Sequence, residues 1–317
     1  MERKPLVSLH LRKPTLPNSL GMTPLMAKIF PLGFILLILC CGGGRLFSKG
    51  SFPARGFAKI LTEKEASLRL NRYRSFLVRD LNQKLYHQSY ALRFRLRHMP
   101  RRGEESVYTG ILSGLALGHG TVRIDMDTVS DDRDGGAILL RAPQNPEAWR
   151  YSKVLAKSLK LEPKDLLDPL VEGINQSPFE LLMPFAFWDA TYEKSGRVAG
   201  RPAHIYRFSC PEWVRTAQPT WVRITLALDD AYEAPLRIET FSNRSVPHKT
   251  FLLNSLKKIE STWIVKTFDC KNRTDASNTR FEVLSAALQL DLDPVLFAPE
   301  GLGRELTVPP EAFLSTK

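Results

Sequence analysis

The sequence contains few of the residue patterns from which common catalytic and metal sites are built. Its 317 residues include four cysteines and six histidines, and neither type has the paired spacing of a zinc site. The Gly-x-Ser-x-Gly turn of many serine hydrolases does not occur. A Gly-x-Gly-x-x-Gly loop, which would indicate a dinucleotide site, is also missing. The sequence therefore predicts no metal and no cofactor, and no pattern in it indicates an enzyme.

Acidic residues are present, but without the spacing of a calcium-binding loop. Five aspartates lie close together in the chain: Asp125, Asp127, Asp131, Asp132 and Asp134. We expect a solvated turn there. The remaining candidates for acid–base chemistry, Glu172, Glu180 and Asp189, are scattered and form no obvious glycosidase pair. A hydrolase acting on envelope polymers is thus the least favoured of three hypotheses.

No apolar run is long enough for a comfortable transmembrane helix, which needs about 20 residues. The run Phe30–Cys41 is a dozen residues long, with Lys28 before it and three glycines after it. This pattern is typical of a secretory signal peptide. We therefore expect residues 1–44 to be a signal peptide or an uncleaved N-terminal anchor, with a buried core helix as the alternative. Met22 or Met26 would give a more typical start than Met1.

The four cysteines fall into two pairs with different expectations. Cys40 and Cys41 end the apolar run, and either is a candidate for lipidation, although the residue before each is larger than a lipobox requires. Cys210 and Cys270 lie in the strand region. An oxidising compartment would permit a disulfide between them. Two buried free thiols are the alternative.

The net charge is +12, and part of it is concentrated in one stretch that includes Arg101 and Arg102. A basic patch can bind nucleic acid or another anionic surface. Export makes nucleic acid an improbable partner, and no nucleic-acid-binding motif is present. A solvated strand face, anionic lipid and an acidic partner remain open.

The dominant feature of the sequence is a series of short strands joined by turns. Alternation of apolar and polar residues predicts an antiparallel meander after residue 220. Its strands are expected at Trp221–Leu228, Pro235–Phe241, Lys249–Ile259, Trp263–Phe268 and Thr279–Leu288. Earlier strands are expected at Leu85–His98, Ser106–Leu117, Thr121–Met126, Ala137–Arg141, Phe185–Lys194 and His204–Cys210. A meander of this length must close into a barrel or curl around something.

Two segments of the chain are predicted not to be strands. A helix is predicted at Leu61–Phe76, because Thr62 and Glu65 form a capping box at its start. Gln144–Leu182 breaks the strand pattern, and we expect loops and short helices there, one of them at Ser177–Met183. The part from Leu161 to Met183 is expected to cover the open face of the sheet.

Large apolar side chains collect on one face of the predicted strands. Those expected to line an apolar cavity are Tyr90, Leu92, Phe94, Leu96, Ile124, Met126, Phe187 and Trp221. A filled core is the alternative. A sheet too large to fill its own interior leaves a cavity, as in lipid-binding barrels. Such a cavity suits acyl chains, since each buried CH₂ group contributes about 0.8 kcal/mol.

From Leu167 to Leu302 the order of segments resembles the LolA-type outer-membrane lipoprotein-sorting family. Five pairs of neighbouring segments carry the resemblance: Pro169–Gly173 and Phe179–Leu182, Gly200–Pro202 and His204–Phe208, Trp221–Leu228 and Ala234–Glu239, Lys249–Phe251 and Thr262–Val265, and Thr279–Val283 and Leu292–Phe297. The chain departs from the family in its insertion Gln144–Lys164 and in its poor lipobox.

The resemblance implies a mainly β fold with a few helices, namely a curved, incomplete antiparallel β-barrel covered by helices. It implies a non-enzymatic protein without a cofactor, in the periplasm of a diderm bacterium. Its partners would be acyl chains of lipoproteins or lipids, together with envelope transport proteins. In the family an early-strand arginine helps to latch the lid, so Arg93, Arg95 and Arg97 are candidates.

The expected organisation is a single binding domain at 61–305, preceded by a short linker at 45–60. Residues 306–317 would form a C-terminal tail. A sensor or interaction module with a filled interior, built on the same scaffold, remains the alternative to a lipid carrier.

Overall fold

The computed structural model describes residues 38–40, 58–78, 88–117, 120–127, 136–141, 144–242 and 245–317. The backbone of β1 (Ile38–Cys40) pairs with β13 (Thr262–Asn272). The rest of the predicted signal segment, including Cys41, lies outside the described residues, as do most of the predicted linker and three of the clustered aspartates. No helix in the described ranges is long and apolar enough to cross a membrane.

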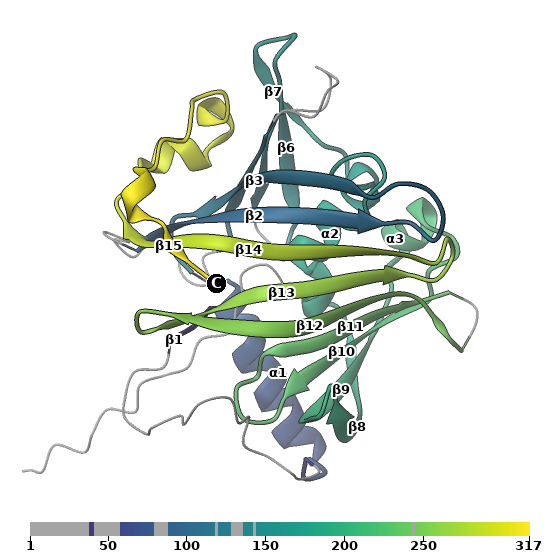
Figure 1. The fold of residues 1–317 in the computed structure, drawn as a ribbon. Helices are drawn as coiled ribbons and strands as arrows, with labels where there is room; N and C mark the ends of the chain where they lie inside the picture. Colours follow the sequence, from purple (N-terminus) through teal and green to yellow (C-terminus); the bar gives the residue numbers. More distant parts are fainter. Residues whose placement is uncertain are drawn as a thin grey trace, which may run out of the picture.

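One antiparallel sheet forms most of the molecule (Figure 1). In chain order its other strands are β2 (Ser89–Met99), β3 (Ser106–Gly114), β4 (Val122–Met126), β5 (Ala137–Arg141), β6 (Glu147–Ser152), β7 (Lys157–Lys160), β8 (Ala190–Val198), β9 (Arg201–Ser209), β10 (Arg223–Asp229), β11 (Pro235–Phe241), β12 (Pro247–Ile259), β14 (Ser277–Leu290) and β15 (Leu314–Ser315). Their spatial order is β7-β6-β5-β4-β3-β2-β14-β13-β12-β11-β10-β9-β8, with β15 beside β14.

This order places the two edges of the sheet in the middle of the chain. Strand β2 pairs with β14, so an early and a late strand lie at the centre, while β7 and β8 form opposite edges. The edges do not pair with each other, and the sheet remains an incomplete barrel. The predicted fold class is therefore confirmed. The chain between the two edges, residues 161–189, has to cross the open face.

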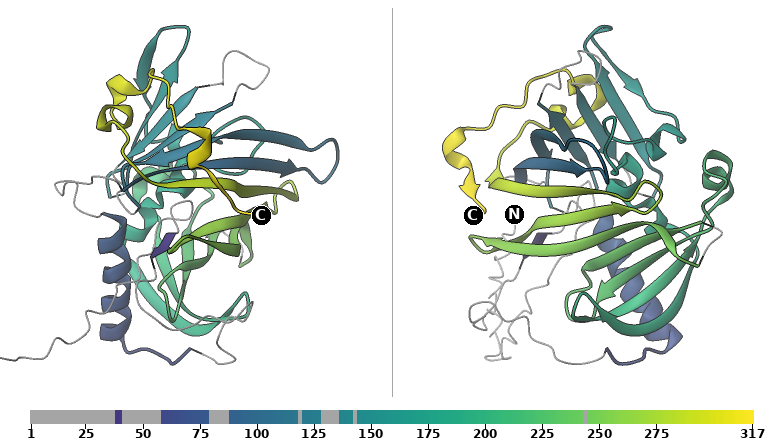
Figure 2. Two further views of the ribbon diagram at one scale, coloured as in Figure 1. Left: turned by 60° about the vertical axis from the view of Figure 1, so that its left-hand side comes forward. Right: turned by 45° about the vertical axis from the view of Figure 1, so that its right-hand side comes forward.

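Helices cover the inner face of the sheet. Helix α1 (Glu63–Leu77) starts at the predicted capping box of Thr62 and Glu65 and lies along one side of the sheet (Figure 2). The crossing segment contains η1 (Asp165–Leu167), α2 (Pro178–Leu182) and η2 (Pro184–Phe187), and α3 (Glu212–Ala217) follows β9.

Three further 3₁₀ turns lie near the C-terminus: η3 (Pro294–Phe297), η4 (Pro299–Gly301) and η5 (Pro310–Ala312).

Two predicted elements were wrong. The start of the segment Gln144–Leu182 forms strands β6 and β7 in place of loops, since Ala148 faces the inner core and Trp149 the outer side. The expected strand at Phe185–Lys194 begins only at Ala190, because Pro184 starts the 3₁₀ turn η2 before it.

Of the two expectations for Cys210 and Cys270, the structure has the buried free thiols and not the disulfide.

The C-terminal segment packs on the outer face and is held there by a buried arginine. Arg123 on β4 is 1% exposed and forms an ion pair with Asp125 at 2.7 Å. Its guanidinium also donates to the main-chain oxygens of Leu296, Gly301 and Arg304 at 3.2, 3.2 and 2.6 Å. At the end of the chain the Thr316 hydroxyl donates to β14, so the expected tail lies against the sheet.

Replacing Arg123 with methionine should lower the free energy of unfolding by about 2 kcal/mol, because three carbonyl groups and a carboxylate lose their donor. Urea unfolding of the full chain measures this loss. The matched variant Arg97→Met, at an arginine 42% exposed on the outer face, should stay within about 0.5 kcal/mol of the unchanged protein. Equal effects of the two substitutions would contradict the role assigned to Arg123.

Candidate functional site

The interior between the sheet and its helices is the candidate site. The segment 161–189, which we call the cover segment, runs from edge strand β7 across the inner face to edge strand β8. Its apolar side chains, among them Phe179, Leu181 and Leu182, belong to the same buried cluster as the inner faces of the strands. The main contacts of the cover segment with the sheet are therefore apolar, and polar contacts occur at separate points.

One group of polar contacts attaches the middle of the cover segment to β13 and β14. The main-chain N–H of Asn175 donates to Thr279 Oγ1 at 3.1 Å, and its side-chain amide donates to Cys270 O at 3.1 Å and Ser277 Oγ at 3.0 Å. The Gln176 amide donates to Thr279 O at 3.3 Å. Asn175 is 6% exposed, so it serves as a buried connection to the sheet.

The second connection is a buried ion pair between α2 and β12. Lys249 Nζ donates to Glu180 Oε1 at 2.6 Å, with side-chain exposures of 13% and 3%. The other oxygen of Glu180 accepts from the main chain and hydroxyl of Ser177, completing the capping box of α2. Burial lowers the pKa of Lys249, but Glu180, together with smaller contributions from other neighbouring groups, raises it, and the net shift is upward.

The third connection joins the end of the cover segment to α1. Arg74 donates to the main-chain oxygens of Ala186 and Trp188 at 2.6 and 2.7 Å. Next to this connection, the Phe179 ring packs against the rings of Trp188 and Trp221, with ring centroids 5.7 Å apart in both pairs. Aromatic packing and Arg74 thus hold the last part of the cover segment over β9 and β10.

Apolar side chains pack closely in the described interior. A cavity of about 10 Å³ is lined by Phe94, Leu96, Leu112, Ile124, Leu170, Gln176, Leu181 and Phe281. That space accommodates about one water molecule and no acyl chain. The single polar lining residue, Gln176, has a side-chain oxygen that lacks a hydrogen-bond partner among the described residues.

The structure places the eight predicted cavity residues in or next to this interior. Phe94, Leu96 and Ile124 line the small cavity. Tyr90, Leu92 and Met126 are buried on the same inner face, and Trp221 is buried in the aromatic group around Phe179. Phe187 is partly buried and packs against the edge of the core. Their role in binding a ligand stays a prediction.

The three predicted latch arginines point away from the cover segment. They alternate along β2 with the inward-facing Tyr90, Leu92, Phe94 and Leu96, and therefore project from the outer face. There Arg95 pairs with Glu282 at 2.5 Å, Arg97 with Glu105 at 3.7 Å, and Arg93 lies over the Phe313 ring. The cover segment is instead contacted by cationic side chains of Arg74, Arg150 and Lys249.

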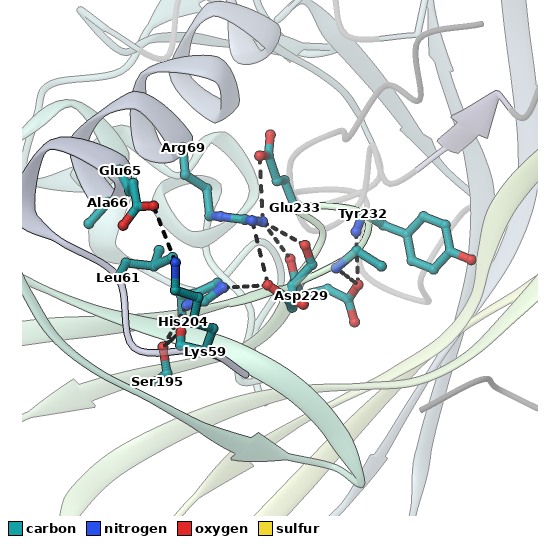
Figure 3. Close-up of polar contacts among 12 residues, drawn as sticks. Lys59, Leu61, Glu65, Ala66, Arg69, Ser195, His204, Asp229, Tyr232 and Glu233 are labelled. Carbon is teal, nitrogen blue, oxygen red and sulfur yellow. Dashed lines mark hydrogen bonds and ion pairs between the residues drawn. The ribbon is translucent and has the colours of Figure 1, made fainter. Parts of the chain in front are cut away.

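A polar network ties the N-terminal end of α1 to the edge of the sheet (Figure 3). His204 is fully buried, with Nδ1 2.8 Å from Ser195 Oγ and Nε2 2.7 Å from Asp230 Oδ1. Arg69 of α1 donates to Asp230 O at 2.7 Å. Register could have indicated one of these contacts, since Ser195 lies opposite His204 in the β8–β9 hairpin.

Hydroxyl, imidazole and carboxylate groups in such a chain are also used by hydrolases. Here, however, Ser195 Oγ also donates to the Lys59 main-chain oxygen at 2.6 Å and contacts Tyr192 OH at 2.6 Å. Tyr192 OH in turn accepts from the Leu61 N–H. The network therefore connects the chain before α1 to β8 and β9, which is a structural task.

No group of three or more potential metal ligands occurs among the described histidines, cysteines and carboxylates. Asp125 is paired with Arg123, and Asp127 accepts from the Thr109 hydroxyl at 2.6 Å. The other clustered aspartates lie outside the described residues.

Replacing Lys249 with methionine should cost about 3 kcal/mol in the free energy of unfolding, because Glu180 would keep its buried charge without a partner. Urea unfolding tests this loss, with Lys271→Met at an exposed position of β13 as the control. The additional change Glu180→Gln should recover part of the loss. If Lys249→Met is as stable as the control, the ion pair does not hold α2.

Acidification should destabilise the fold through its buried histidines. Burial lowers the pKa of His204 despite its hydrogen bond to Asp230, and burial likewise lowers the pKa of His248. The unfolded chain therefore binds more protons as the pH falls below about 6.5, and stability is lost from there downward. The urea midpoint should be lower at pH 5.5 than at pH 7.5, and less so in His204→Gln. A midpoint that rises on acidification would mean that His204 is charged in the fold.

Comparison with known proteins was made by sequence and by structure. No protein-family profile matches the chain, and no curated protein sequence matches it significantly. Solved structures do match. A putative outer membrane lipoprotein-sorting protein domain from Vibrio parahaemolyticus superposes with a TM-score of 0.60 at 15% identity, covering 76% of this chain and 99% of that one.

Two further structures agree with this likeness. A DUF1329 family protein from Desulfovibrio piger has a TM-score of 0.58 at 13% identity, covering 75% of this chain and 98% of its own. A LolA superfamily protein from Nitrosomonas europaea has a TM-score of 0.53 at 13% identity, with coverages of 74% and 97%. The strand order, the open edges and these superpositions show that the chain has a LolA-like fold.

Proposed function

We propose that the protein is an exported, non-enzymatic carrier or acceptor that binds the acyl chains of lipoproteins or lipids in its interior. The observation that carries the proposal is the apolar inner face of an unclosed sheet, covered by a segment that bridges its two edges. The cover segment is held mainly by apolar packing, with polar contacts at separate points, and we expect it to leave the inner face without unfolding of the sheet.

An acyl chain needs far more room than the cavity of about 10 Å³ provides. Binding therefore requires the cover segment to move, so that Phe179, Leu181 and Leu182 leave the inner face. A palmitoyl chain that takes their place would gain on the order of 10 kcal/mol by burial of its CH₂ groups. This gain can offset the loss of a few polar contacts and of the packing of α2.

The wall of the cavity suggests a feature of the ligand. Gln176 Oε1 is a buried acceptor without a partner among the described residues, beside a cavity whose accessible surface is apolar, and displacement of the cover segment would expose it. An acyl chain joined to an amide N–H, as in an N-acylated lipopeptide, would supply a donor there. Together with the likeness to a lipoprotein-sorting domain, this favours lipoproteins over free fatty acids.

The proposed location is the periplasm of a diderm bacterium, where such a protein would receive cargo from one envelope transport partner and pass it to another. The competing function is a sensor or interaction module, in which the interior stays filled and the surface binds a protein. The two differ in whether the interior accepts lipid.

The proposal predicts that the full chain binds a triacylated lipopeptide, as detected by native mass spectrometry. Phe94→Asp should abolish binding, because a charge would lie on the inner face, where Phe94 is 2% exposed. Arg97→Asp places the same residue on the outer face of the same strand and should bind as the unchanged protein does.

Leu96→Gln serves as a second interior variant, because a neutral amide is less disruptive to folding than a carboxylate. Circular dichroism establishes that each variant is folded. Failure of the unchanged chain to bind lipopeptide, or equal binding by the folded interior variants, would favour the interaction module.

A further inference from the structure

The turn between β6 and β7 exposes apolar side chains to solvent. The hairpin tip, Lys153–Lys157, contains Val154 at 82% and Leu155 at 55% exposure. In no other turn of the described chain are two adjacent large apolar side chains exposed. Leu159, which lies on β7 beyond the tip, is 39% exposed. Burial of these side chains in an apolar environment would be favourable, and nothing in the fold provides it.

Lysines surround the apolar tip. Lys153 and Lys157 lie on either side of Val154 and Leu155, and the side chains of both lysines are exposed. No acidic residue occurs in the sequence between Ser152 and Leu161. Lys160, nearer the base, pairs with Glu147 at 2.6 Å. Among the described residues, the tip thus combines positive charge that has no acidic partner with exposed apolar surface.

The base of the hairpin packs against the C-terminal segment. Ser158 donates to the main-chain oxygen of Pro299, and the Tyr151 ring packs on Gly303 so closely that an added Cβ would lie 2.5 Å from it. Arg123 fixes the C-terminal segment that supplies these contacts. The hairpin therefore keeps its direction, and its tip projects beyond the rest of the sheet in all three ribbon views (Figures 1 and 2).

We propose that the hairpin tip docks on an anionic phospholipid bilayer, with Val154 and Leu155 between the headgroups and Lys153 and Lys157 against the phosphates. Apolar side chains at the interface combined with basic residues are a general means of attachment to anionic membranes. Long lysine side chains can reach the phosphates while their stems remain in the apolar layer.

Protection of an exposed sheet edge is another reason for lysines on β7. It does not account for Val154 and Leu155, because exposed apolar residues make an edge more prone to association. The hairpin also leads directly into the cover segment, which starts at residue 161. Docking would therefore hold the entrance of the proposed interior near the membrane.

Binding of the full chain to vesicles tests the proposal. Vesicles of equal parts phosphatidylglycerol and phosphatidylcholine are compared with pure phosphatidylcholine vesicles by flotation. Because the chain also contains the apolar run Phe30–Cys41, the comparison is between variants of the same chain. Val154→Ser/Leu155→Ser and Lys153→Ser/Lys157→Ser remove the apolar and the basic parts of the tip. The control Ile60→Ser/Leu68→Ser alters two apolar residues at 78% and 52% exposure away from the hairpin.

We expect both tip variants to bind the anionic vesicles at least about tenfold more weakly than the unchanged chain and the control. The lysine variant should also lose most of the dependence on salt and on phosphatidylglycerol. Because all four side chains are exposed, the variants should remain folded and bind lipopeptide normally, which separates this proposal from that of the carrier. Unchanged vesicle binding by the tip variants, an equal loss in the control, or no binding by the unchanged chain would overturn it.

Discussion

The structure depends on a single constraint: the inner face of an unclosed sheet is apolar from β6 to β9 and has to be removed from water. The described strands form no second sheet, and the edges β7 and β8 do not pair with each other. The inner face is buried by α1 on one side and by the cover segment, which connects the two edges across the face. Because that segment joins the edges, any opening of the interior must displace it.

The polar contacts of the cover segment lie at separate points along it and determine where it sits more than how strongly it is held. A buried ion pair such as Lys249–Glu180 contributes little net stability, but removal of one partner is costly. The pair therefore fixes the position of α2, while apolar packing supplies most of the favourable free energy. Asn175 and Arg74 act in the same way at two other points.

Much of the fold was readable because its signals are local. Period-two alternation located the long strands of the second half, and the Thr62–Glu65 pattern gave the start of α1. Strand β7 was missed because a short edge strand with exposed lysines lacks an apolar face. The polar contacts of the cover segment could not be predicted for a different reason. Lys249 and Glu180 are 69 residues apart, and no local pattern indicates their contact. Arg95, on an obvious strand, proved to face outward.

Hydrogen–deuterium exchange of the full chain, with and without a triacylated lipopeptide, tests the central claim most directly. The account predicts that amides of residues 165–187, Asn175 in particular, exchange faster when lipopeptide is bound, while those of β13 and β14 stay protected. Bound lipopeptide with unchanged or slower exchange in that segment would contradict it, because the interior would then have been reached without displacing its cover.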